Sequence, residues 1–200
     1  MSDTPRRSRL PWWVRWLHTY VSLLGFAALL FFSVTGVTLN HAEFFEGDAA
    51  SESTVEVELP TDLVADVGRP VDRLAVVEHL RAEHGLRGAV TEFVEDGDVL
   101  DVVFKGPATS AEVRIDREDG RAEIYAVAFG SVALVDDLHK GRNSGTAWSW
   151  VIDASAVVLS ISALTGGWLL LYVRRRRTAG VLVAVVGTVA LVAVYAVWVP

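Results

Sequence analysis

Three long apolar stretches, separated by polar segments, dominate the chain. The stretches 17–39 and 181–199 contain no charged residue, and 150–173 contains only Asp153. A helix of about 20 apolar residues crosses the roughly 30 Å hydrocarbon core of a bilayer. The first stretch is also longer than the apolar region of a cleaved signal peptide, which favours an uncleaved anchor. The pattern predicts three transmembrane helices, at 16–40, 148–173 and 179–199.

Between the first two spans the pattern becomes that of a small soluble domain. Residues 41–69 are acidic and contain Pro60, which predicts a linker with one short strand at 54–59. A helix is predicted from Pro70 to Gly85. Alternating or β-branched runs follow, each closed by a turn signal, and predict a three- or four-stranded antiparallel sheet; the runs are 89–94, 99–104, 110–115 and 121–128.

The fold class is therefore a membrane α-helical protein with a small exported α+β domain at 70–128 and a return segment at 129–147. The expected core of that domain is one helix packed on the sheet. Its expected members are Leu74, Val77, Leu80, Phe93, Val102, Phe104, Val113 and Ile115.

Charge predicts the orientation. Four arginines lie in the basic segment 1–15, and four more fill the turn 174–178 between the second and third spans, so both segments are expected in the cytoplasm. The stretch 41–145 holds 23 of the 25 acidic residues and 10 of the 18 Lys and Arg residues, a net charge of −13. We therefore expect a multi-pass membrane protein with its N-terminus in the cytoplasm and residues 42–145 on the periplasmic or extracellular side. The acidic exterior argues against nucleic acid as a partner.

The chain contains no cysteine, so a disulfide framework, thiolate metal sites, iron–sulfur clusters and covalently attached haem are excluded. It also contains no G-x-S-x-G, H-E-x-x-H, Walker A or G-x-G-x-x-G motif. No catalytic residue is predicted, and whether the protein is an enzyme stays open. Non-covalent haem held by histidine remains compatible with the composition.

Small and polar residues form a stripe on each of the first two spans, including Gly25 and Gly36 on the first and Ser160 and Gly167 on the second. Small residues allow membrane helices to approach closely. The stripes are expected to form a helix–helix contact; a cofactor lying against the glycines is the alternative.

Histidines lie at the ends of the spans, next to recurring motifs. On the first span, Leu17-His18 lies at the start, and Thr35-Gly36 and Asn40-His41 lie at the end. Before the second span lies Leu138-His139-Lys140-Gly141-Arg142. It is followed by Trp148, Ile152-Asp153 and Thr165-Gly166. In these segments, and in the helix-then-β-meander order of 70–128, the chain resembles the PepSY-associated transmembrane-helix proteins, specifically the short PepSY-TM-like group. The resemblance covers most of residues 14–175 and does not include the third span.

The resemblance implies a bacterial plasma-membrane protein. Larger relatives resemble haem-bearing reductases of iron–siderophore complexes, and the PepSY module is associated with inhibition or localisation of proteases. The resemblance thus suggests two alternative functions. The first is haem-linked electron transfer or iron handling at the outer face of the membrane. The second is that of a non-catalytic anchor, which displays a module that binds an exported protein.

The histidines themselves limit what can be bound. His18 and His41 are separated by about 34 Å along a straight helix, so they cannot share one ligand. His41 and His139 both fall at the outer face and are the candidate axial ligands of a b-type haem, or ligands of a bare metal ion beside Glu43, Asp136 or Asp137. Interfacial caps and hydrogen bonds are the alternative role for both.

The remaining candidates surround this pair. Lys140 and Arg142 could hold haem propionates, lipid phosphates or a siderophore carboxylate. His18 would complete a second haem site only with a histidine from another protomer of a homodimer; the alternative is an interfacial polar group that bonds to a lipid head group or a backbone carbonyl. Asp153 is expected to pair with Arg142 or an outer histidine, and His79 and His84 are expected on the surface.

Overall fold

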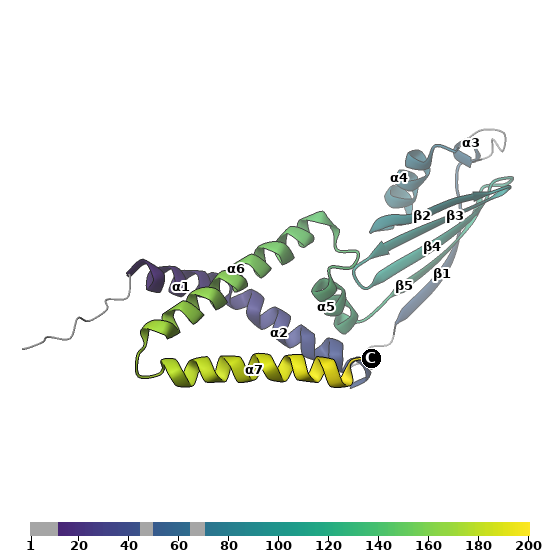
Figure 1. Cartoon of the computed structure of the whole chain (residues 1–200). Coiled ribbons are helices and arrows are strands. Elements are labelled where there is room, and N and C mark those ends of the chain that lie inside the picture. The colour runs from purple at the N-terminus through teal and green to yellow at the C-terminus, as the bar shows by residue number, and fades with distance from the viewer. Residues whose placement is uncertain (1–11, 45–49, 65–70) are drawn as a thin grey trace, which may run out of the picture. The chain divides into compact units, whose positions relative to one another are not determined.

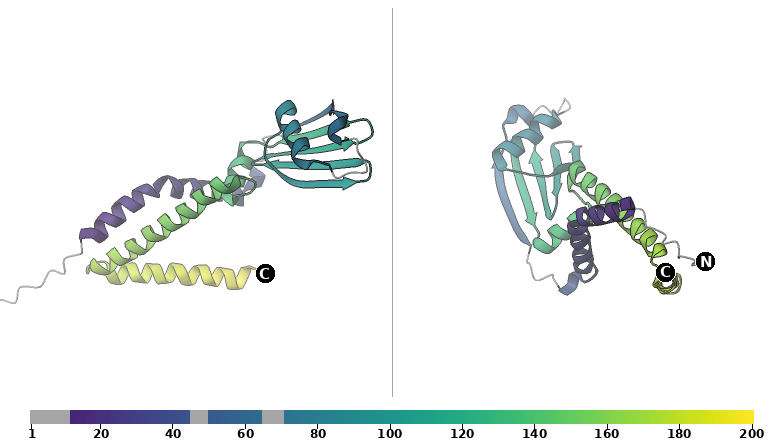
Figure 2. Two further views of the ribbon diagram at one scale, coloured as in Figure 1. Left: turned by 90° about the horizontal axis from the view of Figure 1, so that it is seen from above. Right: turned by 90° about the vertical axis from the view of Figure 1, so that its left-hand side faces the viewer.

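The computed structural model describes residues 12–44, 50–64 and 71–200. The described residues form two compact units: those up to Leu30 together with Asp153–Pro200, and those between Phe31 and Ile152. Figure 1 gives the order of the elements along the chain and Figure 2 two further views.

The first expected span consists of two helices, α1 (Trp12–Leu24) and α2 (Phe26–Asn40), which meet at a bend of 50° (Figure 1). Gly25 lies at the break, where a Cβ atom would come 2.8 Å from Val158 Cγ1 and 3.2 Å from Leu159 Cδ2. Glycine is therefore required for this close approach of the helices, as the small-residue stripe predicts.

The other two apolar stretches form α6 (Gly145–Tyr172) and α7 (Arg177–Trp198), which are each long and apolar enough to cross a membrane. The bent pair α1–α2 is a third candidate. The described helices thus provide two or three spans, and the expected number of three applies only if the bent pair is one span.

The soluble domain is a five-stranded antiparallel sheet with the order β1-β5-β4-β3-β2. Its strands are β1 (Ser51–Glu58), β2 (Ala89–Asp96), β3 (Val99–Gly106), β4 (Thr109–Asp116) and β5 (Arg121–Ala128). The expectation of three or four strands is corrected to five, because β1 also belongs to the sheet. The short strand expected at 54–59 within the linker 41–69 coincides with β1 over residues 54–58. Strand β1 pairs along its whole length with β5.

Two helices, α3 (Thr61–Val64) and α4 (Arg73–His84), lie on one face of the sheet (Figures 1 and 2). Asp72 caps α4 by accepting hydrogen bonds from the backbone N–H groups of Leu74 and Ala75, and Gly85 ends it with a φ of 67°. The helix therefore ends where the sequence predicts and begins three residues after Pro70.

The core lies between α4 and the sheet. Alternation along β3 buries Leu100, Val102 and Phe104 completely, and the other side chains of this core come from the remaining strands and helices. Seven of the eight expected core residues belong to it or pack against it, but Leu74 is 69 % exposed. Leu74 lies about 110° around the helix axis from the middle of the arc formed by Val76, Val77 and Leu80.

The segment expected only to return the chain to the membrane contains a ten-residue helix, α5 (Ser131–Lys140). A short 3₁₀ turn, η1 (Ala42–Phe44), follows α2. Both lie in the second unit, with the sheet.

Candidate histidine–threonine sites

His18 on α1 contacts α6 at a threonine–glycine pair. Its Nδ1 lies 2.9 Å from Thr165 Oγ1 and 3.4 Å from Ser22 Oγ. A Cβ atom on Gly166 would come 3.2 Å from His18 Cε1. The imidazole ring therefore lies directly against the backbone of α6, and glycine leaves the space that it occupies.

His139 on α5 contacts α2 in the same way. Its Nδ1 lies 2.6 Å from Thr35 Oγ1, and a Cβ atom on Gly36 would lie 3.6 Å from its Cε1. The ring of Phe32 meets the imidazole edge-on, at 5.2 Å between centroids. Each of the two histidines thus contacts the threonine–glycine pair of another helix, and we call each arrangement a clasp.

The threonines determine which ring nitrogen carries the proton. Thr35 Oγ1 donates to Phe31 O at 2.7 Å, and Thr165 Oγ1 lies 2.7 Å from Ile161 O. A hydroxyl group has one proton, so once that proton is donated to a backbone carbonyl the oxygen accepts from the imidazole. Nδ1–H is therefore the donor in both clasps, and in the neutral ring Nε2 carries the lone pair.

The second ring nitrogen, Nε2, is not an unsatisfied buried atom in His18 or in His139. In the described part of the chain, the buried side-chain polar atoms without a hydrogen-bond partner are His84 Nε2 and Ser162 Oγ. A fixed Nδ1–H with a free Nε2 is the usual arrangement of a metal-ligating histidine. The donor chemistry of His18 and His139 therefore fits an iron ligand, and it fits a structural helix clasp equally well.

Four consecutive residues of α5 hold three different elements. Asp136 and His139 bind α2, Asp137 binds the β3–β4 turn, and Leu138 binds α6. The contacts are Asp136 Oδ1 with Thr38 Oγ1 (3.1 Å), Asp137 Oδ2 with Ala108 N (2.9 Å), Leu138 O with Trp148 Nε1 (2.8 Å) and the clasp of His139 with Thr35.

Ala108, at the β3–β4 turn, is buried and has a φ of 52°, a left-handed conformation that is costly for a residue with a Cβ atom. Its N–H donates to Asp137, and its carbonyl accepts from Phe129 N at 2.8 Å. The turn is thus held in this conformation by α5 and the residues that lead into it.

His41 lies elsewhere. Its exposed ring is 5.8 Å from that of Phe44, and its Nε2 is 3.5 Å from Asn40 Nδ2. Among the described residues no ring contact or hydrogen bond joins His41 to His139. The described chain also contains no group of three or more His, Cys, Asp or Glu residues placed to hold a metal ion. Shared ligation by the two histidines stays a prediction.

The other candidate residues have simpler surroundings. Lys140 and Arg142 are exposed at the end of α5, so their cationic groups are accessible. Asp153 is exposed on α6 and makes no ion pair with the described residues of its own unit. His79 and His84 are partly buried rather than fully on the surface, with ring centroids 6.0 Å apart on α4.

The clasp threonines are the residues that sequence reasoning missed as part of a site. Both belong to Thr-Gly pairs at the ends of apolar stretches, each in a stretch that begins near a histidine. This repetition of a histidine and a Thr-Gly pair is the sequence signal that could have identified the threonines as part of a site. It does not reveal which histidine meets which threonine, because the pairs are 147 and 104 residues apart in the chain.

The comparisons with known proteins give one match. A family model described as "Putative PepSY_TM-like" matches residues 12–200, so the match includes the third span, which the expected resemblance left out. No curated protein and no solved structure gave a match.

Proposed function

Since the chain belongs to the PepSY_TM-like family, we propose that this membrane protein carries a b-type haem at the outer face of a bacterial plasma membrane. In this proposal it transfers electrons in iron or siderophore handling. The chain has no nicotinamide or flavin motif, so the electron donor is another molecule.

The observation that carries the proposal is the fixed tautomer of His139. Thr35 holds Nδ1–H and leaves the Nε2 lone pair available, which is the state that an axial haem ligand requires. His41, exposed directly after the end of the helix that carries Thr35, is the proposed second ligand. Bound haem would supply one-electron chemistry.

The surrounding residues have supporting roles in the proposal. Lys140 and Arg142 would pair with the propionate carboxylates, because hydrogen bonds between oppositely charged groups are stronger than those between neutral groups. His18 repeats the geometry of His139 but no histidine partner for its ring is described. A second haem at His18 therefore requires a homodimer, in which another copy supplies the ligand.

Visible spectra of the detergent-purified protein, oxidised and then reduced with dithionite, test the proposal. Wild-type protein expressed with ample haem should show a Soret band and α bands. His139→Ala and His41→Ala should each abolish or strongly shift these bands, because the haem would lose one of the two histidines proposed to hold it. His79→Ala is the matched control and should leave the spectrum unchanged.

A wild-type protein without a Soret band would overturn the haem proposal. The chain would then be a non-catalytic anchor that displays its PepSY-like sheet to an exported protein such as a protease. The contacts of α5 favour this second function specifically, because they attach the sheet firmly to the ends of α2 and α6. In that case the clasps serve to join helices.

The proposed orientation makes a separate prediction. With an N-terminus in the cytoplasm, Ser51 lies outside and Thr178 inside, because both arginine-rich segments favour the cytoplasmic side. Fusions of alkaline phosphatase and of green fluorescent protein at these two positions should give opposite activities. Equal signals at Ser51 and Thr178 would contradict the orientation.

A further inference from the structure

The two edges of the sheet differ in how well they are protected. On β2 the register shifts between Val90 and Glu92, which marks a bulge. Arg73 of α4 also reaches this edge strand, 3.4 Å from Glu95 and 5.1 Å above the ring of Phe93. Bulges and covering side chains are the usual devices against pairing at a sheet edge.

Strand β1, at the other edge, has neither device. Its register with β5 is uninterrupted over eight residues, and every residue except Val57 is exposed. The strand contains no proline, lysine or glycine, and no described strand pairs with its outer side. It is a long open edge, which is the usual template for strand addition.

The backbone direction identifies the groups that are free at this edge. Leu59 N donates to Gly120 O, so at Leu59, directly after β1, the N–H points toward β5. Backbone direction alternates along an antiparallel strand. The residues whose N–H and C=O groups point outward are therefore Glu52, Thr54, Glu56 and Glu58.

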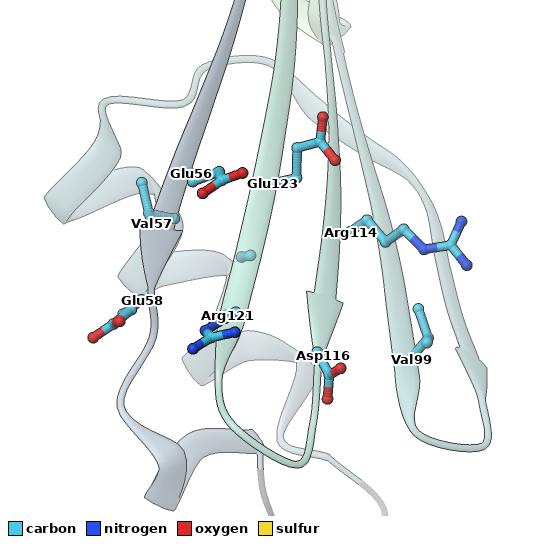
Figure 3. A pocket seen from close by; sticks show the side chains of 9 residues that line it. Glu56, Val57, Glu58, Val99, Arg114, Asp116, Arg121 and Glu123 are labelled. Carbon is cyan, nitrogen blue, oxygen red and sulfur yellow. The ribbon is translucent and has the colours of Figure 1, made fainter.

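The side chains of these same residues make the edge acidic. Glu56 lies opposite Glu123 in the register, and Figure 3 shows the two carboxylates on neighbouring strands of the open face. Arg121 lies opposite Glu58 but its guanidinium pairs with Asp119 at 3.3 Å. No ion pair joins Glu56 or Glu58 to a described cation. Like charges placed opposite each other destabilise a sheet.

Negative potential extends along this face. The pKa of Tyr125 is raised, first because its hydroxyl is hydrogen-bonded to Glu52, then by desolvation and by the negative charges of Glu52 and Glu112. Glu52 belongs to β1 and Glu112 to β4, so the acidic surface reaches across β5.

The opposite face of β1 carries Ser51 and Ser53 at its start and two valines towards its end. Val55 is 51 % exposed, and Val57 packs at the margin of the core. The edge therefore presents carboxylates on one face and valines on the other, with free backbone groups between them.

We propose that β1 is a docking edge for an extended basic segment of another protein, which adds to the sheet as a sixth strand. In that segment Lys or Arg side chains alternate with apolar ones. The basic side chains lie along Glu52, Glu56 and Glu58, and the apolar ones cover Val55. This inference goes beyond the proposed function and does not depend on haem.

A second copy of the chain is a poorer occupant. Pairing β1 with another β1 would place glutamates on the same face beside glutamates, which is repulsive. A basic segment instead neutralises the carboxylates that the fold leaves without cationic partners.

The test measures binding of a fluorescent ten-residue peptide of alternating Lys and Val to the full-length protein in neutral detergent, by anisotropy. The peptide should bind, and binding should weaken as salt is raised. Two control peptides should not bind: one alternates Glu and Val, and the other is the Lys–Val peptide methylated on alternate backbone nitrogens, which removes its strand-pairing donors.

Two sets of variants separate backbone pairing from charge. Thr54→Pro removes one outward N–H and no bond to β5, so it should weaken binding about fivefold or more while Thr54→Ala binds as wild type. Glu56→Gln together with Glu58→Gln should weaken binding and reduce its salt dependence. Protease resistance of the sheet checks that each variant is folded.

The outcomes decide the proposal. Undiminished binding by a folded Thr54→Pro variant, or equal binding of the methylated peptide, would overturn strand addition. Unchanged affinity in the double glutamine variant would overturn recognition of basic side chains. Absence of Lys–Val binding together with self-association of the wild type would assign the edge to a second copy instead. If Thr54→Pro does not fold, the methylated peptide still tests backbone pairing on the wild-type protein.

Discussion

Replacing Val102 by aspartate should unfold the sheet while leaving the membrane helices inserted. Val102 is 0 % exposed at the centre of β3, between the strands and α4. An unpaired carboxylate buried at this position should lower the free energy of unfolding by more than about 4 kcal/mol. Small domains have a total stability of about 5–15 kcal/mol. Limited proteolysis of the protein in membranes should therefore cut residues 71–128 rapidly and leave α6 intact.

The matched control is Val94→Asp, on the neighbouring strand. Val94 is 49 % exposed on the open face of the sheet and lies opposite Asp101. The new carboxylate stays in water, so only the repulsion between the two acids remains, which is about 0.2–1 kcal/mol. A Val102→Asp protein that resists protease as well as Val94→Asp does would contradict the core assignment.

Replacing Thr35 by valine should loosen the attachment of α5 to α2. The substitution keeps the shape of the side chain but removes the oxygen that accepts from His139 Nδ1–H. A donor left without a partner costs about 1–3 kcal/mol when buried, and His139 is only partly buried. We expect a loss of about 1 kcal/mol, seen as faster hydrogen exchange of the α5 amides.

A double-mutant cycle with His139→Phe isolates the clasp, because phenylalanine retains a ring without Nδ1. The two substitutions should be strongly non-additive. Thr188→Val on α7 is the control: Thr188 Oγ1 bonds to Ala184 O of its own helix, so nothing outside α7 should change. Additive effects of Thr35→Val and His139→Phe would show that the hydrogen bond contributes nothing to the attachment.

Much of the architecture follows from periodicity. Apolar runs locate α6 and α7 to within a few residues, and alternation locates β2 to β5, because each pattern reflects one environment along the whole element. Strand β1 was missed as part of the sheet because serine and glutamate dominate it. It is an exposed edge whose regularity comes from backbone pairing with β5 rather than from burial.

The site was predicted less completely, for a physical reason. Sequence reasoning identified His18 and His139 as unusual because a membrane helix does not need histidine at its end. Their partners depend on which helix faces surround each ring, and that is set by close contacts such as the one at Gly166. The bend at Gly25 was likewise missed, since an isolated glycine within an apolar run does not by itself indicate a break.

Through its four contacts, α5 connects the sheet to the ends of α2 and α6. A shift by one residue would turn every side chain by about 100°. Asp136, Asp137 and His139 would then all leave their partners together. Because Asp137 and His139 lie on the same helix, a displacement of the β3–β4 turn should also disturb the contact of the His139 ring with α2. A ligand bound at either end would then be coupled to the other end, with the same coupling free energy in both directions.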